Sequence, residues 1–145
     1  MARNRLFQTR KHQYMKIMIV EDDQLLRDYL VEAMQSLNHT VYPAGSTSLA
    51  LKKLEKHEPE LFLIDIVMPG NDGIYLCEEL RANPRFFNTP IIMMTGISAS
   101  DDVIDRAFDG GADDFLLKPI NLRILERRID IVEWKKSSNT QIPQL

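Results

Sequence analysis

The side chains of this chain that are best suited to chemistry are acids, a hydroxyl and an amine that end or directly follow short apolar runs. They are Glu21, Asp22, Asp23, Asp65, Thr95 and Lys118. Clustered carboxylates repel one another, and their pKa values rise unless a cation lies between them. Oxygen ligands without Cys or His favour Mg2+, which proteins usually hold with one or two carboxylates and phosphate oxygens. The set therefore predicts a magnesium-assisted phosphoryl site.

Each of these residue types suits a particular role. Asp22 and Asp65, with a nearby backbone carbonyl, suit a metal ion. The Lys118 amine is a point charge that binds phosphate oxygens, and the Thr95 hydroxyl donates one hydrogen bond. An aspartate can also be the nucleophile that forms an aspartyl phosphate. Catalysis at such a site consists of positioning and charge neutralisation.

Alternating periodicities predict the elements that hold these side chains. Short runs of apolar residues predict five strands, at residues 16–20, 40–44, 61–64, 90–94 and 115–117. Apolar residues at helical spacing follow each run, and the last two helices are expected at 101–109 and 122–136. Five such units in series predict an α/β fold, a doubly wound parallel sheet with helices on both faces. Ligands bind to such sheets beyond the carboxyl ends of the strands, where the six residues fall.

The composition predicts one globular domain, because 145 residues with 44% apolar and 27% charged positions suffice for a single core. We expect this domain at residues 15–136, with a basic, flexible arm at 1–14 and a polar tail or linker at 137–145. The domain is acidic, so we expect no direct binding of nucleic acid by it. No apolar run approaches the ~18 residues that cross a bilayer, and the N-terminus lacks the apolar stretch of a secretory signal. We therefore expect a cytoplasmic protein without membrane contact.

The remaining chemistry-bearing residues are expected to be structural. Cys77 is the single cysteine, which excludes an intramolecular disulfide, and the three histidines lack the spacing of a zinc site. Cys77 falls on the inner side of a helix, where a thiol is buried and inert. Asp23 and Ser46 are expected to cap the helices that follow them.

Four motifs occur in order at successive strand ends. They are the acidic triplet at 21–23, the loop DIVMPGNDG at 65–73, Thr95, and GADDFLLKP at 111–119. Through these motifs residues 15–135 resemble the receiver domain of bacterial two-component response regulators. The resemblance implies a flavodoxin-like (βα)5 sheet with strand order 2-1-3-4-5. It also implies a phosphoprotein of a phosphorelay, which takes a phosphoryl group from a sensor histidine kinase or a histidine phosphotransfer protein and is not a multi-turnover enzyme.

The resemblance also implies roles for individual residues of the metal site. Asp65 matches the phosphoacceptor, and Asp22 matches the acid that binds Mg2+. Glu21 is the outer neighbour of that acid, in a position where Asp is frequent. The main-chain carbonyl of Val67 matches the backbone ligand of the metal.

A second group matches the switch of the family. Thr95 and Lys118 correspond to the pair that contacts the phosphoryl group, and Phe115 to the aromatic residue whose rotation reports phosphorylation. Phe115 lacks the hydroxyl of the frequent Tyr, so its switching must work by packing alone. The resemblance further implies a cis bond between Lys118 and Pro119.

Other classes of function fit the sequence less well. A phosphatase of the haloacid dehalogenase type needs a second acid two residues after its nucleophile, and position 67 is Val. No glycine-rich phosphate loop follows the first strand, which argues against dinucleotide and P-loop sites. The alternative that stays open is a receiver fold that serves as an interaction module without phosphorylation.

Apolar side chains near the site and on the last helix lead to two more expectations. Val67 and Ile97 are expected to flank the route of an attacking water, and neither can orient it, which predicts slow self-hydrolysis of the phosphoryl group. On the last helix Ile124, Ile131 and Trp134 form a second apolar stripe, away from the stripe that faces the sheet. We expect this stripe, with the helix at 101–109 and the strand at 115–117, to mediate phosphorylation-dependent homodimerisation or docking of an output partner.

Overall fold

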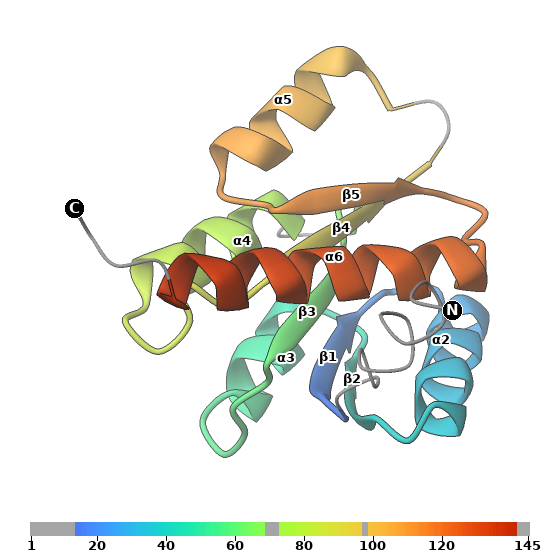
Figure 1. The fold of residues 1–145 in the computed structure, drawn as a ribbon. Coiled ribbons are helices and arrows are strands. Elements are labelled where there is room, and N and C mark those ends of the chain that lie inside the picture. The colour runs from blue at the N-terminus through green and yellow to red at the C-terminus, as the bar shows by residue number, and fades with distance from the viewer. Residues whose placement is uncertain (1–13, 69–72, 97–98, 142–145) are drawn as a thin grey trace, which may run out of the picture.

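The computed structural model describes residues 14–68, 73–96 and 99–141. Within these residues five strands alternate with five helices (Figure 1). The strands are β1 (Lys16–Val20), β2 (Thr40–Ala44), β3 (Leu61–Asp65), β4 (Ile91–Thr95) and β5 (Asp114–Leu117). The helices are α2 (Gln24–Ser36), α3 (Thr47–Lys53), α4 (Gly73–Ala82), α5 (Asp101–Asp109) and α6 (Leu122–Gln141). Each predicted strand is present, with shifts of one residue at some ends.

The strands form one parallel sheet in the order β2-β1-β3-β4-β5. Its centre is apolar on both faces, and every residue of β3 and β4 is buried. Central strands of this kind need helices on both sides, because each face of the sheet must be removed from water. The order and the parallel pairing confirm the predicted doubly wound, flavodoxin-like fold.

Two layers of helices provide that cover. On one face α3, α4 and α5 contribute buried residues such as Ala50, Cys77 and Ala107 to a core with β1, β3 and β4. On the other face α2 and α6 contribute residues such as Leu30 and Leu125. Figure 1 shows α6 crossing in front of the sheet, with α2 below it on the same side. Cys77 is fully buried, as predicted.

Polar side chains begin the helices at the carboxyl ends of the strands. The carboxylate of Asp23 accepts hydrogen bonds from the backbone amides of Leu25 (3.0 Å) and Leu26 (3.2 Å), which caps α2. Ser46 caps α3 through the amide of Leu49 (3.2 Å). Both predicted caps are therefore confirmed, and they fix where the chain turns from strand to helix.

The end of the last helix differs from the prediction. We expected it to stop near Lys136, but α6 continues to Gln141. The polar residues 137–140 are only moderately poor helix formers, and neither Gly nor Pro interrupts the chain before Pro143. The predicted tail at 137–145 therefore begins as the last turns of α6. The predicted arm at 1–14, apart from Tyr14, lies outside the described residues.

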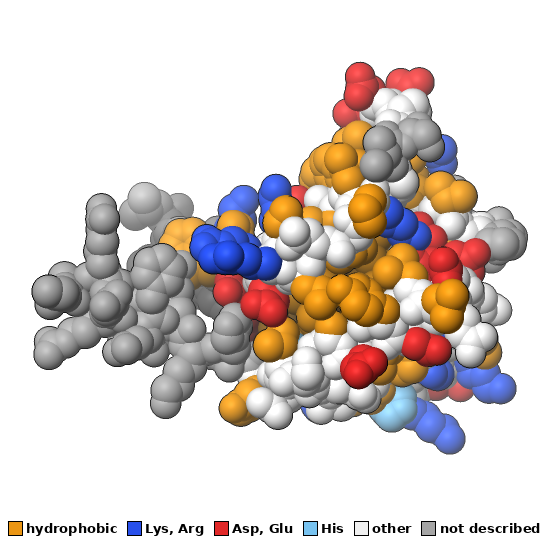
Figure 2. Space-filling view, turned by 90° about the vertical axis from the view of Figure 1, so that its right-hand side faces the viewer, with side chains coloured by type: hydrophobic (Ala, Val, Ile, Leu, Met, Phe, Trp, Pro, Cys, Tyr) orange, Lys and Arg blue, Asp and Glu red, His pale blue; other side chains and the backbone are white. Residues whose placement is uncertain are grey.

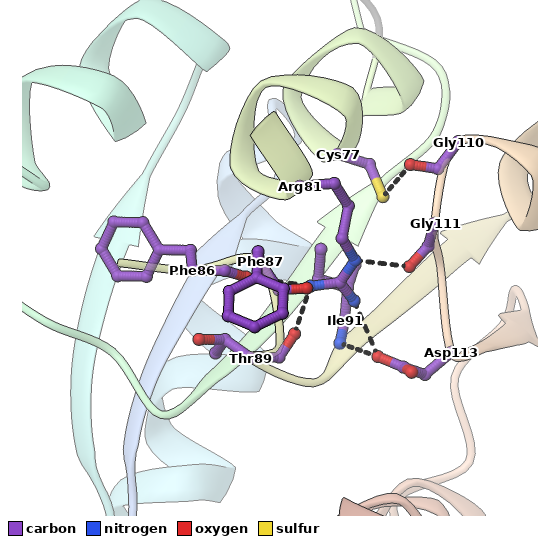
Figure 3. Close-up of polar contacts among 9 residues, drawn as sticks. All are labelled: Cys77, Arg81, Phe86, Phe87, Thr89, Ile91, Gly110, Gly111 and Asp113. Carbon is purple, nitrogen blue, oxygen red and sulfur yellow. Dashed lines mark hydrogen bonds and ion pairs between the residues drawn. The ribbon is translucent and has the colours of Figure 1, made fainter. Parts of the chain in front are cut away.

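Arg81, at the end of α4, ties together the segments that lead into β4 and β5 (Figure 3). Its guanidinium donates to the carbonyl oxygens of Gly111 (2.8 Å) and Thr89 (2.7 Å) and to the carboxylate of Asp113 (2.9 Å). The same carboxylate oxygen accepts from the amide of Ile91 (2.9 Å). This network fixes the amino ends of β4 and β5, and hence the strands whose opposite ends carry Thr95 and Lys118.

Candidate functional site

The carboxyl ends of β1, β3, β4 and β5 bring the predicted site residues together. Asp65 and Thr95 are the last residues of β3 and β4, and Glu21 and Lys118 directly follow β1 and β5. The amide of Lys118 donates to the carbonyl oxygen of Thr95 (2.6 Å), which continues the sheet pairing into the site. The bond from Lys118 to Pro119 is cis, as the resemblance implied.

Three carboxylates converge at this edge. One oxygen from each of Glu21, Asp22 and Asp65 lies within 4.8 Å of the other two. Glu21 and Asp65 are buried, whereas Asp22 is exposed to solvent. An oxygen-only cluster that is open on one side fits Mg2+, which keeps several water ligands. The donor set therefore fits the predicted ion.

Lys118 bridges the two buried acids. Its Nζ lies 2.6 Å from Glu21 Oε1 and 3.2 Å from Asp65 Oδ2. The side chain of Lys118 is about one quarter exposed, so its amine remains accessible from the open side of the site. A positive charge in this place can neutralise a phosphoryl group on Asp65.

The buried charges shift two pKa values. Burial, with a smaller contribution from neighbouring Asp65, raises the pKa of Glu21 from 4.5 to about 7 against the opposing ion pair with Lys118. Burial acts to lower the pKa of Lys118, but the hydrogen bond to Glu21 and the charge of Asp65 outweigh it, so that this pKa is raised. The lysine therefore stays positively charged, while Glu21 binds a proton readily when no metal ion is present.

The backbone around Asp65 is closely packed, which sequence reasoning did not anticipate. The amide of Val67 donates to Asp65 Oδ1 (3.2 Å), and the amide of Gly73 donates to the carbonyl oxygen of Ile66 (2.8 Å). A Cβ atom on Gly73 would lie 1.9 Å from the carbonyl oxygen of Asp65, so only glycine fits there. The sequence signal for this was a glycine at the start of a helix directly after the loop.

Arg27 is a second residue that the sequence analysis missed. Its guanidinium donates to the carbonyl oxygen of Glu21 (2.8 Å) and, at 3.4 Å, to that of Asp22. It thereby fixes the backbone of the acidic triplet from the first turns of α2. Its position four residues after the α2 cap Asp23 gave only a weak hint, because arginines on helix surfaces are common.

The two predicted switch residues differ in their surroundings. Thr95 is buried, with 1% of its surface exposed. Phe115 is half-buried and packs edge-on against Phe108 of α5, with ring centroids 5.5 Å apart. Phe115 is thus connected to α5 by an aromatic contact that a change of side-chain orientation would break.

Of the two residues expected to flank the water route, only one is described. Val67 is 69% exposed, next to Asp65 through its amide, and its place beside a water route stays a prediction. Ile97 lies outside the described residues.

The predicted second stripe of α6 lies on the surface. Ile124, Ile131 and Trp134 are each about half exposed, and so is Leu117 of the neighbouring strand β5. Leu117 and Ile124 line one shallow groove together with Pro119. Acidic side chains gather at the top of the molecule in Figure 2, where α5 lies. This part of the surface therefore combines apolar side chains on α6 and β5 with the acidic helix α5.

Comparison with known proteins gives one family. Residues 17–130 match the family model described as the response regulator receiver domain. The chain is 34% identical over 127 residues to the heme response regulator HssR of Staphylococcus aureus, and the match covers 86% of the chain and 55% of HssR. It is 33% identical over 116 residues to the transcriptional regulatory protein AfsQ1 of Streptomyces coelicolor, which covers 80% of the chain and 50% of AfsQ1. The chain thus spans about half the length of these curated relatives.

Solved structures give the same result for the fold. A CheY-like response regulator receiver domain protein from Methanospirillum hungatei matches with a TM-score of 0.80 at 27% identity, covering 88% of this chain and 99% of that one. A two-component response regulator from Clostridium difficile matches with a TM-score of 0.75 at 26% identity, covering 83% and 96%. Among the described residues, no helix is long and apolar enough to cross a membrane.

Proposed function

Because the chain belongs to the response regulator receiver domain family, and hence to the phosphoacceptors of two-component signalling, we propose that Asp65 is its phosphoacceptor. The donor is a phosphohistidine on a sensor histidine kinase or a histidine phosphotransfer protein. The observation that carries this proposal is the convergence of three carboxylates within 4.8 Å beside the amine of Lys118. The relatives named above are a heme response regulator and a transcriptional regulatory protein, and we propose that this chain likewise is not a multi-turnover enzyme.

The reaction needs one nucleophile and compensation of charge. A carboxylate oxygen of Asp65 forms the new P–O bond, while the P–N bond to the donor imidazole breaks. The electron pair of the broken bond stays on the imidazole, which then takes up a proton. Lys118 and Thr95 bind oxygens of the transferred group, and Lys118 compensates one of its negative charges.

Mg2+ is the cofactor that this donor set fits. Asp22, Asp65 and the main-chain carbonyl of Val67 would hold the ion, and the nearby Glu21 carboxylate would serve as its outer ligand. When bound, the ion neutralises the negative charge that gathers on the phosphoryl oxygens. The charge of the two buried acids is then balanced without the proton that Glu21 otherwise attracts.

Phosphorylation acts on the rest of the molecule through a shift between two conformations. In the phosphorylated conformation Thr95 moves toward the phosphoryl group. Phe115 then rotates, which breaks its contact with Phe108. The surface formed by α5, β5 and α6 responds, because Phe108 and Phe115 belong to it. We propose that this surface, with Ile124, Ile131 and Trp134, mediates homodimerisation or docks an output partner.

The setting of the domain follows from the same arguments. We propose that residues 15–136 form the receiver unit of a cytoplasmic protein, which contacts neither membranes nor nucleic acid through this unit. The competing function is an interaction module that works without phosphorylation. Such a module has no chemical need for Asp22, Asp65, Thr95 and Lys118 at one edge of the sheet, which argues against it.

Incubation with acetyl phosphate tests the proposed function. The intact mass should increase by one phosphoryl group in the presence of Mg2+, and the increase should be absent with EDTA and in Asp65→Ala. Asp23→Ala is the matched control, because that acid caps α2 instead of taking part in the reaction. If Asp65→Ala is phosphorylated as fully as the wild type, the proposal is wrong.

A further inference from the structure

Asp22, the acid proposed to hold Mg2+, is exposed to solvent, so packing does little to fix its side chain. Its direction depends on the two rigid peptide planes that flank its Cα atom. The plane before it carries the carbonyl oxygen of Glu21, and the plane after it carries its own carbonyl oxygen. Both oxygens accept from one nitrogen of Arg27, Nη1, at 2.8 Å and, more weakly, at 3.4 Å. A single guanidinium nitrogen thus restrains the backbone on both sides of Asp22.

Arg27 is itself placed by two neighbouring segments. Its amide donates to the carbonyl oxygen of Asp23 (2.9 Å), which fixes its backbone at the start of α2. Its guanidinium lies against the turn between β2 and α3, where a Cβ atom on Gly45 would come within 3.1 Å of Nη1. That distance is shorter than an ordinary van der Waals contact, so a side chain at position 45 would press on the guanidinium. The glycine therefore leaves the space from which Arg27 reaches the two carbonyl oxygens.

We propose that Arg27 is a positioning residue for Asp22, which strengthens the binding of Mg2+, and that Gly45 provides the space it needs. The inference rests on the proposed function, because it assumes that the ion binds at Asp22. Arg27 acts through main-chain carbonyl oxygens, whereas its positive charge by itself would repel a divalent cation and weaken its binding. Removal of the guanidinium therefore has opposite effects on the affinity, depending on whether orientation or charge matters more.

The first experiment measures this sign by calorimetric titration with MgCl2. Arg27→Met should weaken Mg2+ binding by about tenfold, at the lower end of what the loss of a partner behind a metal ligand costs. Arg27→Lys should restore part of the affinity, because its amine can still donate to one carbonyl oxygen. Arg127→Met, which removes the same side chain from an exposed position on α6, is the matched control and should leave the affinity unchanged. Unchanged or stronger binding in Arg27→Met would overturn the inference.

The second experiment disturbs the same contact from the other side without changing any charge. Gly45→Ala should weaken Mg2+ binding in the wild type, because the new methyl group displaces the guanidinium. In Arg27→Met the same substitution should have no further effect, since contacting residues couple. An equal loss of affinity in both backgrounds would show that Gly45 acts independently of Arg27, which contradicts the proposal.

A third measurement, in EDTA, separates positioning from a general effect on stability. The amides of Glu21 and Asp23 donate to the carbonyl oxygen of Ala44 (3.0 Å) and to the Glu21 carboxylate (3.3 Å). Their hydrogen exchange should quicken in Arg27→Met, while the amides of β3 keep their protection. Faster exchange throughout the sheet would mean that Arg27 serves only the stability of the fold, and the inference would be wrong.

The titrations also distinguish this inference from the proposed function on which it rests. If the wild type binds no Mg2+, the proposed metal site is wrong and the role of Arg27 is wrong with it. If the wild type and Arg27→Met bind Mg2+ equally well, the metal site stands and the role of Arg27 alone is refuted.

Discussion

At the scale of single residues, the buried carboxyl of Glu21 makes the stability of the metal-free protein depend on pH. Its pKa is raised from 4.5 to about 7, so the folded state binds a proton more tightly than the unfolded state between these values. Unfolding then releases protons, and the free energy of unfolding falls as the pH rises through this window. Mg2+ should oppose the fall, because it stabilises the ionised carboxylates.

We predict that urea unfolding in EDTA shows this loss of stability between pH 4.5 and 7, and that Glu21→Gln reduces the slope. The matched control is Glu60→Gln, an exposed acid far from the site. An unchanged slope in Glu21→Gln would contradict the assignment of this pH dependence to Glu21.

Val67 leads to a prediction about the lifetime of the phosphorylated state. It is exposed at the rim of the site and offers no group that can orient a water molecule. Val67→Asn combined with Ile97→Glu should accelerate release of inorganic phosphate from the phosphorylated protein by about tenfold, below the full effect of a general base. Leu49→Asn, at an exposed apolar position on α3, is the control. The same release rate in the double variant and the wild type would refute the prediction of slow self-hydrolysis.

The sequence predicted residues of the site whose chemistry is visible in their type. Asp65, Thr95 and Lys118 could be found because acids, a hydroxyl and an amine after apolar runs are unusual together. Arg27 and Arg81 could not be found in this way, since their role depends on carbonyl oxygens that only the folded chain brings near them. The contact of Lys118 with both Glu21 and Asp65 depends on distances and was equally out of reach.

At the scale of elements, the first residue of α4 is packed closely against the site. Gly73 begins this helix directly against the backbone of Asp65. Gly73→Ala should lower the free energy of unfolding by about 1–3 kcal/mol, since a Cβ there meets a carbonyl oxygen that cannot move without disturbing β3.

Gly96 provides the control for this prediction. A Cβ atom on Gly96 would have no neighbour within 4 Å, so Gly96→Ala should leave the stability unchanged or raise it slightly. Urea unfolding of the two variants beside the wild type measures the difference. Equal stabilities of Gly73→Ala and Gly96→Ala would mean that the chain relaxes around Gly73 at no cost.

The ends of helices were predictable where a capping residue or a glycine pair fixes them. Asp23 and Ser46 cap their helices, and the pair Gly110 and Gly111 ends α5, with Gly111 at a φ of +107°. The end of α6 was missed because residues 137–141 contain no such stop. Helix propensity varies too little among polar residues to mark an end by itself.

At the scale of the whole molecule, the fold was predictable because five apolar runs separated by helical segments leave few topologies open. The surface was harder to predict, since exposed apolar residues occur in several places besides α6, among them Leu25, Leu49 and Phe87. Exposure alone does not distinguish a contact surface from the scattered exposed apolar residues that most protein surfaces carry. The place of the α6 stripe beside β5, whose Phe115 contacts α5, distinguishes it.

We predict that the protein bound to beryllium fluoride, a mimic of the phosphoryl group, forms a dimer through this surface. Ile131→Glu should shift the dimer to monomer in sizing with light scattering, because a buried unpaired carboxylate is costly. Leu49→Glu, which places the same charge at a similarly exposed site on α3, should leave the dimer intact. If the wild type remains monomeric and Ile131→Glu does not weaken binding of an output partner, this surface is not the interface.

The most direct test of the central claim locates the phosphoryl group on the chain. After incubation with acetyl phosphate and Mg2+, borohydride reduces an aspartyl phosphate to homoserine, and fragmentation of the peptides shows where the homoserine lies. We predict homoserine at position 65, present only when both donor and Mg2+ were supplied, and absent from protein incubated with EDTA. Homoserine at another aspartate, or none after incubation with a phosphohistidine donor as well, would contradict the assignment of Asp65 as phosphoacceptor.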